Sequence, residues 1–117
     1  MKAGELAERI GAEILTRRRD DDVDIGRVYA GDRMSDLLRE VSEGTLLVTN
    51  LGTDGLVRLV DLMEAPGICL VSGAGASEAL LAAAEEHGAV VMVSPGSLFE
   101  TCGRLYEELE GGGRRNG

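Results

Sequence analysis

A chain of 117 residues with 44% apolar and 28% charged residues fits one globular domain, large enough to bury a core without disulfide or metal support. Its formal net charge of −9, with Lys2 as the only lysine, excludes the basic faces that bind nucleic acid or anionic membranes. Acidic residues interrupt the N-terminal segment, and no apolar run reaches the roughly 20 residues that span a bilayer, so we expect a cytoplasmic protein without a membrane partner.

The first part of the chain predicts two helices and two strands around a charged block. The helices are expected over residues 1–10 and 36–41, and the strands over 12–16 and 25–30. Between the strands, Arg17-Arg18-Arg19-Asp20-Asp21-Asp22 is interpreted as a solvated loop. Asp32 or Ser35 can cap the second helix, because short oxygen side chains accept hydrogen bonds from free N–H groups at a helix start.

From Thr45 onward, strands and helices alternate. Strands are expected over 45–49, 68–71 and 89–93, and helices over 56–64, 77–87 and 97–109. The strands are short and continuously apolar, which is typical of burial on both faces. Alternation with short connections predicts a single α/β domain, with a mostly parallel central sheet of four to five strands flanked by helices. This domain is expected over residues 1–110, followed by a disordered Gly-rich tail over 111–117.

Loops rich in Gly, Ser and Thr follow the last three strands. The carboxyl ends of parallel strands share one edge, where open α/β sheets bind their ligands, and the helix N-termini there favour an anion. The alternative is that these residues only turn the chain and cap the helices. The candidate ligand-binding residues are Asn50, Gly52, Thr53, Asp54, Ser72, Gly73, Gly75, Ser77, Ser94 and Ser97, with Asp32 and Arg33 as further candidates after the preceding strand.

The sequence contains no familiar catalytic constellation. Gly73-Ala74-Gly75 begins like a dinucleotide fingerprint, but Glu78 stands at its third small position, and no P-loop is present. His87 is the only histidine, so a zinc site, a serine triad and a cysteine nucleophile all lack partners. We interpret it as a helix-end residue that satisfies the last carbonyls. Cys69 and Cys102 are expected to be reduced core residues. We therefore expect no enzyme activity, no metal and no cofactor.

Four segments, MKAGELAERIGAEIL, VYAGDRMSDLL, ICLVSGAGASEALLAAAEEHGAVVMVS and SLFETCGRLYEEL, cover nearly the whole chain in a characteristic order. This order resembles the DRTGG domain family, which is related to the N-terminal domain of HPr kinase/phosphorylase. Two motifs depart from the family. Its Gly-Gly turn reads Ser72-Gly73-Ala74-Gly75, and its Gly-Asp-Arg-Thr-like segment reads Gly52-Thr53-Asp54-Gly55, without the arginine.

The resemblance implies a regulatory or interaction module without established catalytic residues. Such domains are often attached to CBS domains or phosphotransacetylases, tend to form dimers, and occur as small stand-alone versions beside iron-only hydrogenase genes of anaerobes. The leading hypothesis is thus a non-catalytic homodimeric domain, accessory to hydrogenase or signalling systems, with its interface on an outer strand or helix. The alternative is a nucleotide- or phosphate-binding domain that acts with an enzyme of phosphorylated metabolites. A third hypothesis is an unfamiliar enzyme site at Asp32 or Asp54.

Overall fold

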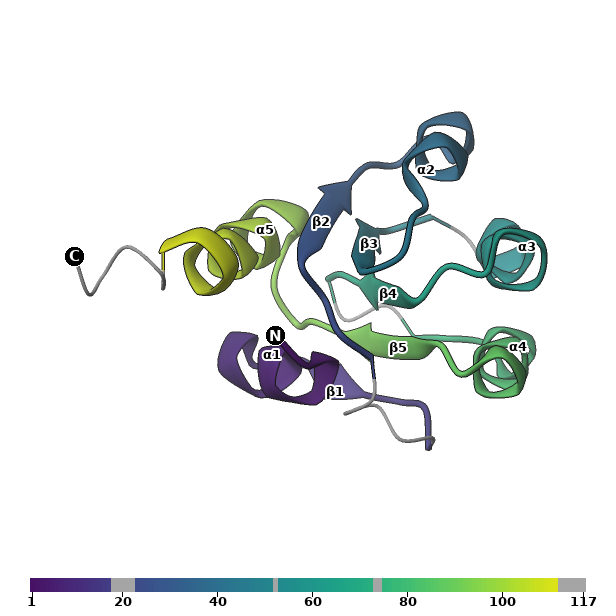
Figure 1. Cartoon of the computed structure of the whole chain (residues 1–117), viewed down its shortest axis with the longest axis horizontal. Helices are drawn as coiled ribbons and strands as arrows, with labels where there is room; N and C mark the ends of the chain where they lie inside the picture. Colours follow the sequence, from purple (N-terminus) through teal and green to yellow (C-terminus); the bar gives the residue numbers. More distant parts are fainter. Residues whose placement is uncertain (18–22, 52, 73–74, 112–117) are drawn as a thin grey trace.

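The helices and strands follow one another in nearly the order that the sequence predicts (Figure 1). The computed structural model describes residues 1–17, 23–51, 53–72 and 75–111. The helices are α1 (Ala3–Ile10), α2 (Met34–Glu40), α3 (Thr53–Met63), α4 (Glu78–His87) and α5 (Leu98–Tyr106), the last continuing into a π-helical turn, η2 (Glu107–Gly111). The strands are β1 (Glu13–Ile14), β2 (Arg27–Ala30), β3 (Thr45–Thr49), β4 (Gly67–Leu70) and β5 (Val90–Val93).

The strands form one sheet in the order β1-β5-β4-β3-β2. The neighbours from β2 to β5 are parallel, whereas β1 pairs antiparallel with β5. The predicted mostly parallel sheet with flanking helices is therefore confirmed. The strand expected over 12–16 is shorter than predicted and ends at Ile14. It starts one residue late because the Ala12 N–H donates to the Ala7 carbonyl at the end of α1, at 2.8 Å.

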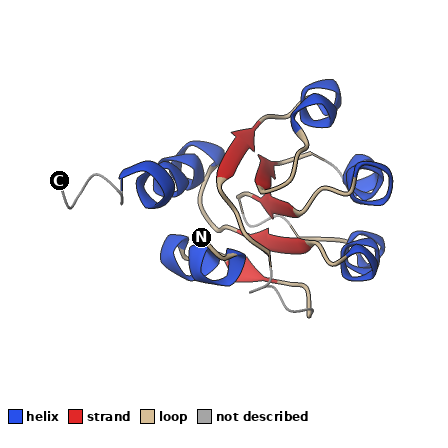
Figure 2. Ribbon diagram, viewed as in Figure 1, coloured by secondary structure: helices blue, strands red, loops and turns tan. Residues whose placement is uncertain are grey.

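Helices cover both faces of the sheet (Figure 2). Right-handed crossovers between sequential parallel strands place α2, α3 and α4 on one face, and α1 and α5 cover the other. Leu47, Ile68 and Val91 belong to the core beneath α2, α3 and α4. Cys69 and Met92 point the opposite way, into the core beneath α1 and α5. Because alternate residues enter different cores, the central strands must be apolar along their whole length.

Two helix starts differ from the sequence-based expectation. α3 begins at Thr53, so Asp54 and Gly55 lie in a helix rather than in the predicted loop. A Cβ on Gly55 would meet the flexible end of Met34, on α2, which would have to move aside. The prediction that Asp32 or Ser35 caps α2 was wrong. The residue at the cap position is Arg33, and no side chain caps the helix. Ser35, the other predicted cap, already lies inside its first turn.

The ends of α4 agree with the prediction. Ser77 Oγ accepts a hydrogen bond from Leu80 N at 3.1 Å, and Gly88 ends the helix in the left-handed region at φ 75°. α5 ends at Tyr106, earlier than expected, because the chain widens into η2.

Two expectations fall largely outside the described residues. Of the charged block 17–22, only Arg17 is described, and its N–H donates to Glu85 Oε2 at 2.9 Å. Of the predicted tail 111–117, only Gly111 is described, as the last residue of η2. Within the described ranges, no helix has the length and apolar character needed to cross a bilayer.

Candidate functional site

The predicted site residues follow strands whose carboxyl ends lie along one edge of the sheet. β3, β4 and β5 are parallel neighbours, so the loops after them are adjacent. The chain leaves β4 toward α4 on one face and β5 toward α5 on the other (Figure 1). Such a divergence between adjacent strands is the position where open α/β sheets form a ligand crevice. Ser72 N donates to the Gly96 carbonyl at 2.7 Å and thereby ties the two diverging loops together.

The serines of the loop after β5 are engaged within the protein. Ser94 is buried, and its Oγ lies 2.7 Å from Thr101 Oγ1 while also accepting from Gly96 N at 3.3 Å. Ser97 and Glu100 form a reciprocal capping box at the start of α5. The backbone and side chain of Ser97 donate to this carboxylate and lower the pKa of Glu100. The hydroxyls of Ser94 and Ser97 therefore hold the loop and cap the helix, as expected under the alternative that these residues do not bind a ligand.

The loop after β4 is more open. Ser72 is exposed and adopts a left-handed backbone at φ 61°, which is uncommon for a residue with a side chain. Gly75 is exposed, and a Cβ built on it would meet nothing within 4 Å. Asn50, on the neighbouring loop, is exposed as well. Gly52 and Gly73 lie outside the described residues, and the side chain of Thr53 is not described.

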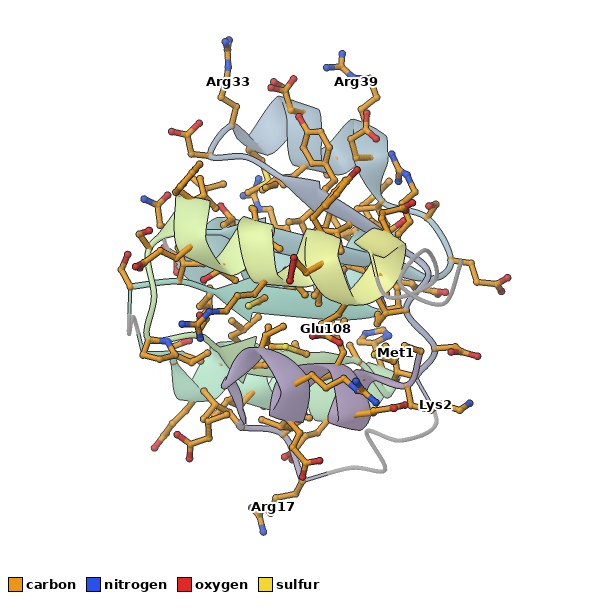
Figure 3. The ribbon with its side chains drawn as sticks, turned by 90° about the vertical axis from the view of Figure 1, so that its left-hand side faces the viewer. Met1, Lys2, Arg17, Arg33, Arg39 and Glu108 are labelled. Carbon is orange, nitrogen blue, oxygen red and sulfur yellow. The ribbon has the colours of Figure 1, made fainter. Side chains whose placement is uncertain are left out.

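The electrostatics of this edge are acidic. The first turns of α2, α3, α4 and α5 contain Asp36, Asp54, Glu78 and Glu100, respectively. These carboxylates already complement the positive ends of the helix dipoles. Arg33, at the start of α2, is exposed and extends away from the ribbon, with Arg39 at the other end of the same helix (Figure 3). A phosphate group at this edge would meet more carboxylates than guanidinium groups. Ligand binding by the candidate residues therefore remains a prediction.

The thiols and the histidine are not arranged as a nucleophile and its base. Both cysteines are free, as expected. Burial raises the pKa of Cys69 to about 12 and also raises the pKa of Cys102, so both thiols stay protonated near neutral pH. His87 Nε2 lies 3.1 Å from Asp61 Oδ1 on α3. The expected contact of His87 with helix-end carbonyls is thus replaced by a pairing with a side chain from a neighbouring helix.

A second surface, which the sequence reasoning did not locate, runs along α5. Phe99, Cys102 and Tyr106 recur at i, i+3 and i+7, so they form one stripe on this helix. Phe99 is 87% exposed and Tyr106 is 59% exposed. The chain has only three aromatic residues, and two of them lie on this stripe. The signal in the sequence was this spacing of aromatic residues beside the buried positions of the helix.

Cys102 and Tyr106 of this stripe line a groove between α5 and β2, whereas Phe99 lines a separate hollow beside Arg9 and Arg104. The groove has a volume of about 370 Å³. Its lining includes the apolar side chains of Val28, Ala30, Leu105 and Leu109 and the charged residues Arg27 and Glu110. A second acidic residue of η2 turns the other way. Glu108 lies between α5 and α1, where its carboxylate is 3.3 Å from Arg9 (Figure 3).

β2 forms the open edge of the sheet beside this groove. Arg27 N donates to the Gly44 carbonyl and Gly31 N to the Val48 carbonyl, both on the β3 side. Because strand residues alternate, Val28 and Ala30 direct their N–H and C=O groups away from β3. Within the described part of the chain, no strand pairs with β2 on that side. We call the β2 edge, the groove and the Phe99–Cys102–Tyr106 stripe together the β2/α5 surface.

No protein-family model and no curated protein matches the chain. Among solved structures, it is similar to the crystal structure of the CBS and DRTGG domains of the regulatory region of Clostridium perfringens pyrophosphatase, complexed with the activator diadenosine tetraphosphate. The TM-score is 0.73 at 16% sequence identity, over 89% of this chain. The chain spans 45% of the length of that regulatory region. The likeness is one of fold, and it supports the DRTGG-like domain that the sequence predicts.

Proposed function

We propose that the chain is a non-catalytic regulatory domain that works as a homodimer, with the β2/α5 surface as its interface. The observation that carries this proposal is the coincidence of an unpaired strand edge with exposed aromatic residues on the adjacent helix. Tyr and Phe are enriched in interfaces, and an open strand edge is a template for pairing with another chain. The protonated thiols, and the pairing of His87 with Asp61 rather than with a nucleophile, support a role without catalysis.

A second copy of the chain fits this surface by symmetry. Two β2 strands related by a two-fold axis perpendicular to the sheet would pair antiparallel and make one continuous sheet. The same axis leaves both α5 helices on one face, so that each stripe approaches the groove of the partner. Copies with a net charge of −9 repel each other, so the attraction must come from the apolar side chains of the groove, whose lining also includes Arg27 and Glu110. The turning of Glu108 toward α1 is consistent with this arrangement.

The regulatory part of the proposal rests on the structural neighbour. That protein is described as a regulatory region, and a regulatory domain needs an interface more than it needs a catalytic group. We place this domain in the cytoplasm, where Cys69 and Cys102 stay reduced. The accessory roles in hydrogenase or signalling systems that the sequence resemblance implies are settings in which such a dimer would act.

The interface is tested by sedimentation of matched variants. The change of both Phe99 and Tyr106 to Gln removes the aromatic stripe, and we expect the dimer dissociation constant to rise by about tenfold or more, since each lost anchor counts twice across a two-fold interface. Leu62→Gln is the matched control, because Leu62 is 76% exposed on α3, on the opposite face of the sheet. Equal dissociation constants for the two variants would exclude the β2/α5 surface.

A second candidate function is nucleotide binding at the divergence of the loops after β4 and β5. The favouring observations are the crevice position between these strands and the nucleotide activator bound by the structural neighbour. We expect diadenosine tetraphosphate or a simpler nucleotide to raise the unfolding midpoint, and Gly75→Val to abolish the effect by filling the open space there. A panel of nucleotides without any shift would contradict this function and leave the dimer proposal intact.

A further inference from the structure

A cluster of one histidine and two carboxylates joins the last turns of α3 and α4. Asp61 comes from α3, and Glu86 and His87 come from α4. Each offers one ligand atom, these atoms all lie within 4.8 Å of one another, and all three residues are exposed. We propose that Asp61, Glu86 and His87 form a surface site for a divalent transition-metal ion, with zinc as the ion that fits the donors best.

The spacing of the donor atoms suits a small ion. Zinc bonds imidazole nitrogen at about 2.0–2.1 Å and carboxylate oxygen at about 2.0–2.2 Å, so two ligands of a tetrahedral site lie roughly 3.3 Å apart. His87 Nε2 and Asp61 Oδ1 are already 3.1 Å apart. Glu86 is exposed at the end of its helix, and its carboxylate oxygen lies within 4.8 Å of the other two ligand atoms. An ion bound there would replace the hydrogen bond between His87 and Asp61.

The helix ends make this position favourable for a cation. The last turns of α3 and α4 meet here, and each helix carries a partial negative charge at its C-terminal end. The last turn of α3 has no basic residue, and the basic residue in the last turn of α4 is His87 itself. The net charge of −9 raises the concentration of cations near the protein further.

The donor set selects the class of ion. Imidazole nitrogen suits zinc, nickel, copper and iron, whereas magnesium and calcium prefer oxygen ligands alone. Three protein ligands on an exposed surface leave a position for water or for a donor from a second molecule. The sequence reasoning missed this site because it sought several Cys and His ligands at short spacing. Here Asp61 lies 26 positions from His87, and only the packing of α3 on α4 brings them together.

The test uses the full chain, freed of metal by a chelator and titrated with Zn²⁺ against a chromophoric competitor. We expect one Zn²⁺ per chain with a micromolar dissociation constant, and no displacement by millimolar Mg²⁺. His87→Ala, Asp61→Asn and Glu86→Gln should each weaken binding by at least about tenfold, since loss of even an indirect partner of a metal ligand weakens binding roughly 10–100-fold. All three side chains are exposed, and circular dichroism verifies that the variants fold.

Two control variants test whether residues outside the proposed site bind Zn²⁺. Glu8→Gln removes an exposed carboxylate from α1, on the far face of the sheet, and should leave Zn²⁺ affinity unchanged. Cys102→Ser removes the partly exposed thiol and should also leave it unchanged. Co²⁺ bound at the proposed site should show visible bands without a thiolate charge-transfer band. The proposal is overturned by an affinity that is equal in wild type and His87→Ala, by loss of binding in Cys102→Ser, or by the absence of saturable binding below millimolar Zn²⁺.

Discussion

The buried hydrogen bond between Ser94 and Thr101 should hold the loop after β5 against α5, and its energy can be measured. The two hydroxyl oxygens are 2.7 Å apart and both residues are buried. Thr101→Val keeps the shape of the side chain and removes the hydroxyl. The lost bond costs about 1 kcal/mol, and the Ser94 hydroxyl that loses its buried partner adds to this cost. The total stays at roughly 1–2 kcal/mol because Ser94 Oγ still accepts from Gly96 N.

This cost should be visible in the unfolding midpoint. A domain of this length has an unfolding entropy of about 0.25 kcal/mol/K, so we expect Thr101→Val to lower the midpoint by roughly 4–8 °C. Ser94→Ala should cost a similar amount. In the double variant both hydroxyls are gone and neither is left unpaired, so the two costs should not add.

The assay is a double-mutant cycle by urea denaturation of the wild type, the two single variants and the double variant. We expect a coupling free energy of about 1 kcal/mol between Ser94 and Thr101. Thr101→Ser, which keeps the hydroxyl, should retain most of that coupling. A coupling below about 0.3 kcal/mol, the level at which independent sites add, would refute a structural role for this pair.

Three further predictions concern thiol reactivity, a helix end and a capping box. Thiol reagents at pH near 8 should leave Cys69 unmodified in the folded chain, because burial raises its pKa to about 12, and should modify Cys102 more slowly than a free thiol; rapid labelling of Cys69 would contradict this. Gly88→Ala should lower the free energy of unfolding by about 1 kcal/mol and Gly88→Asn by less, because φ is 75° there while the surrounding space is open. The pKa of Glu100 is lowered in the folded state, so its ionised carboxylate stabilises the fold. This stabilisation is fully present at pH values above the ordinary pKa of about 4.3, and it is lost as the pH falls through the lower pKa of the folded state. Glu100→Gln should therefore flatten the acid limb of the stability curve, and an unchanged acid limb would show that the bond to Ser97 contributes nothing.

The regular part of the fold was predictable because local patterns determine it. Strands apolar along their whole length, such as residues 45–49, and helices between short loops are sufficient to predict a parallel sheet covered on both faces. Ser77 and Gly88 were placed correctly because a cap is a local hydrogen-bonding requirement. The start of α3 was misplaced because Gly55 suggests a loop, whereas the helix already begins at Thr53 and accommodates this glycine beside Met34.

The functional surfaces were harder to predict because they depend on which elements become neighbours. The position of the strand ends was sufficient to predict that the loops after β4 and β5 are neighbours. The hydrogen bond between Ser72 and Gly96 that joins these loops could not be predicted in this way. The role proposed for Tyr106 on this stripe depends on the position of α5 beside the open edge of β2. The pairing of His87 with α3 likewise depends on helix packing, which no spacing in the sequence encodes.

Amide hydrogen exchange at β2, measured by NMR at low and high protein concentration, tests the proposed dimer most directly. The N–H groups of Val28 and Ala30 face the open edge, so they should exchange rapidly in dilute solution and become protected at high micromolar concentration. Gly31 N, which donates to the Val48 carbonyl at 3.0 Å, provides an internal control whose bonding is the same in both states. Protection of Val28 and Ala30 that rises with concentration would support pairing of two β2 edges. Exchange that stays rapid at every concentration, in a sample that sediments as a monomer, would contradict the dimer.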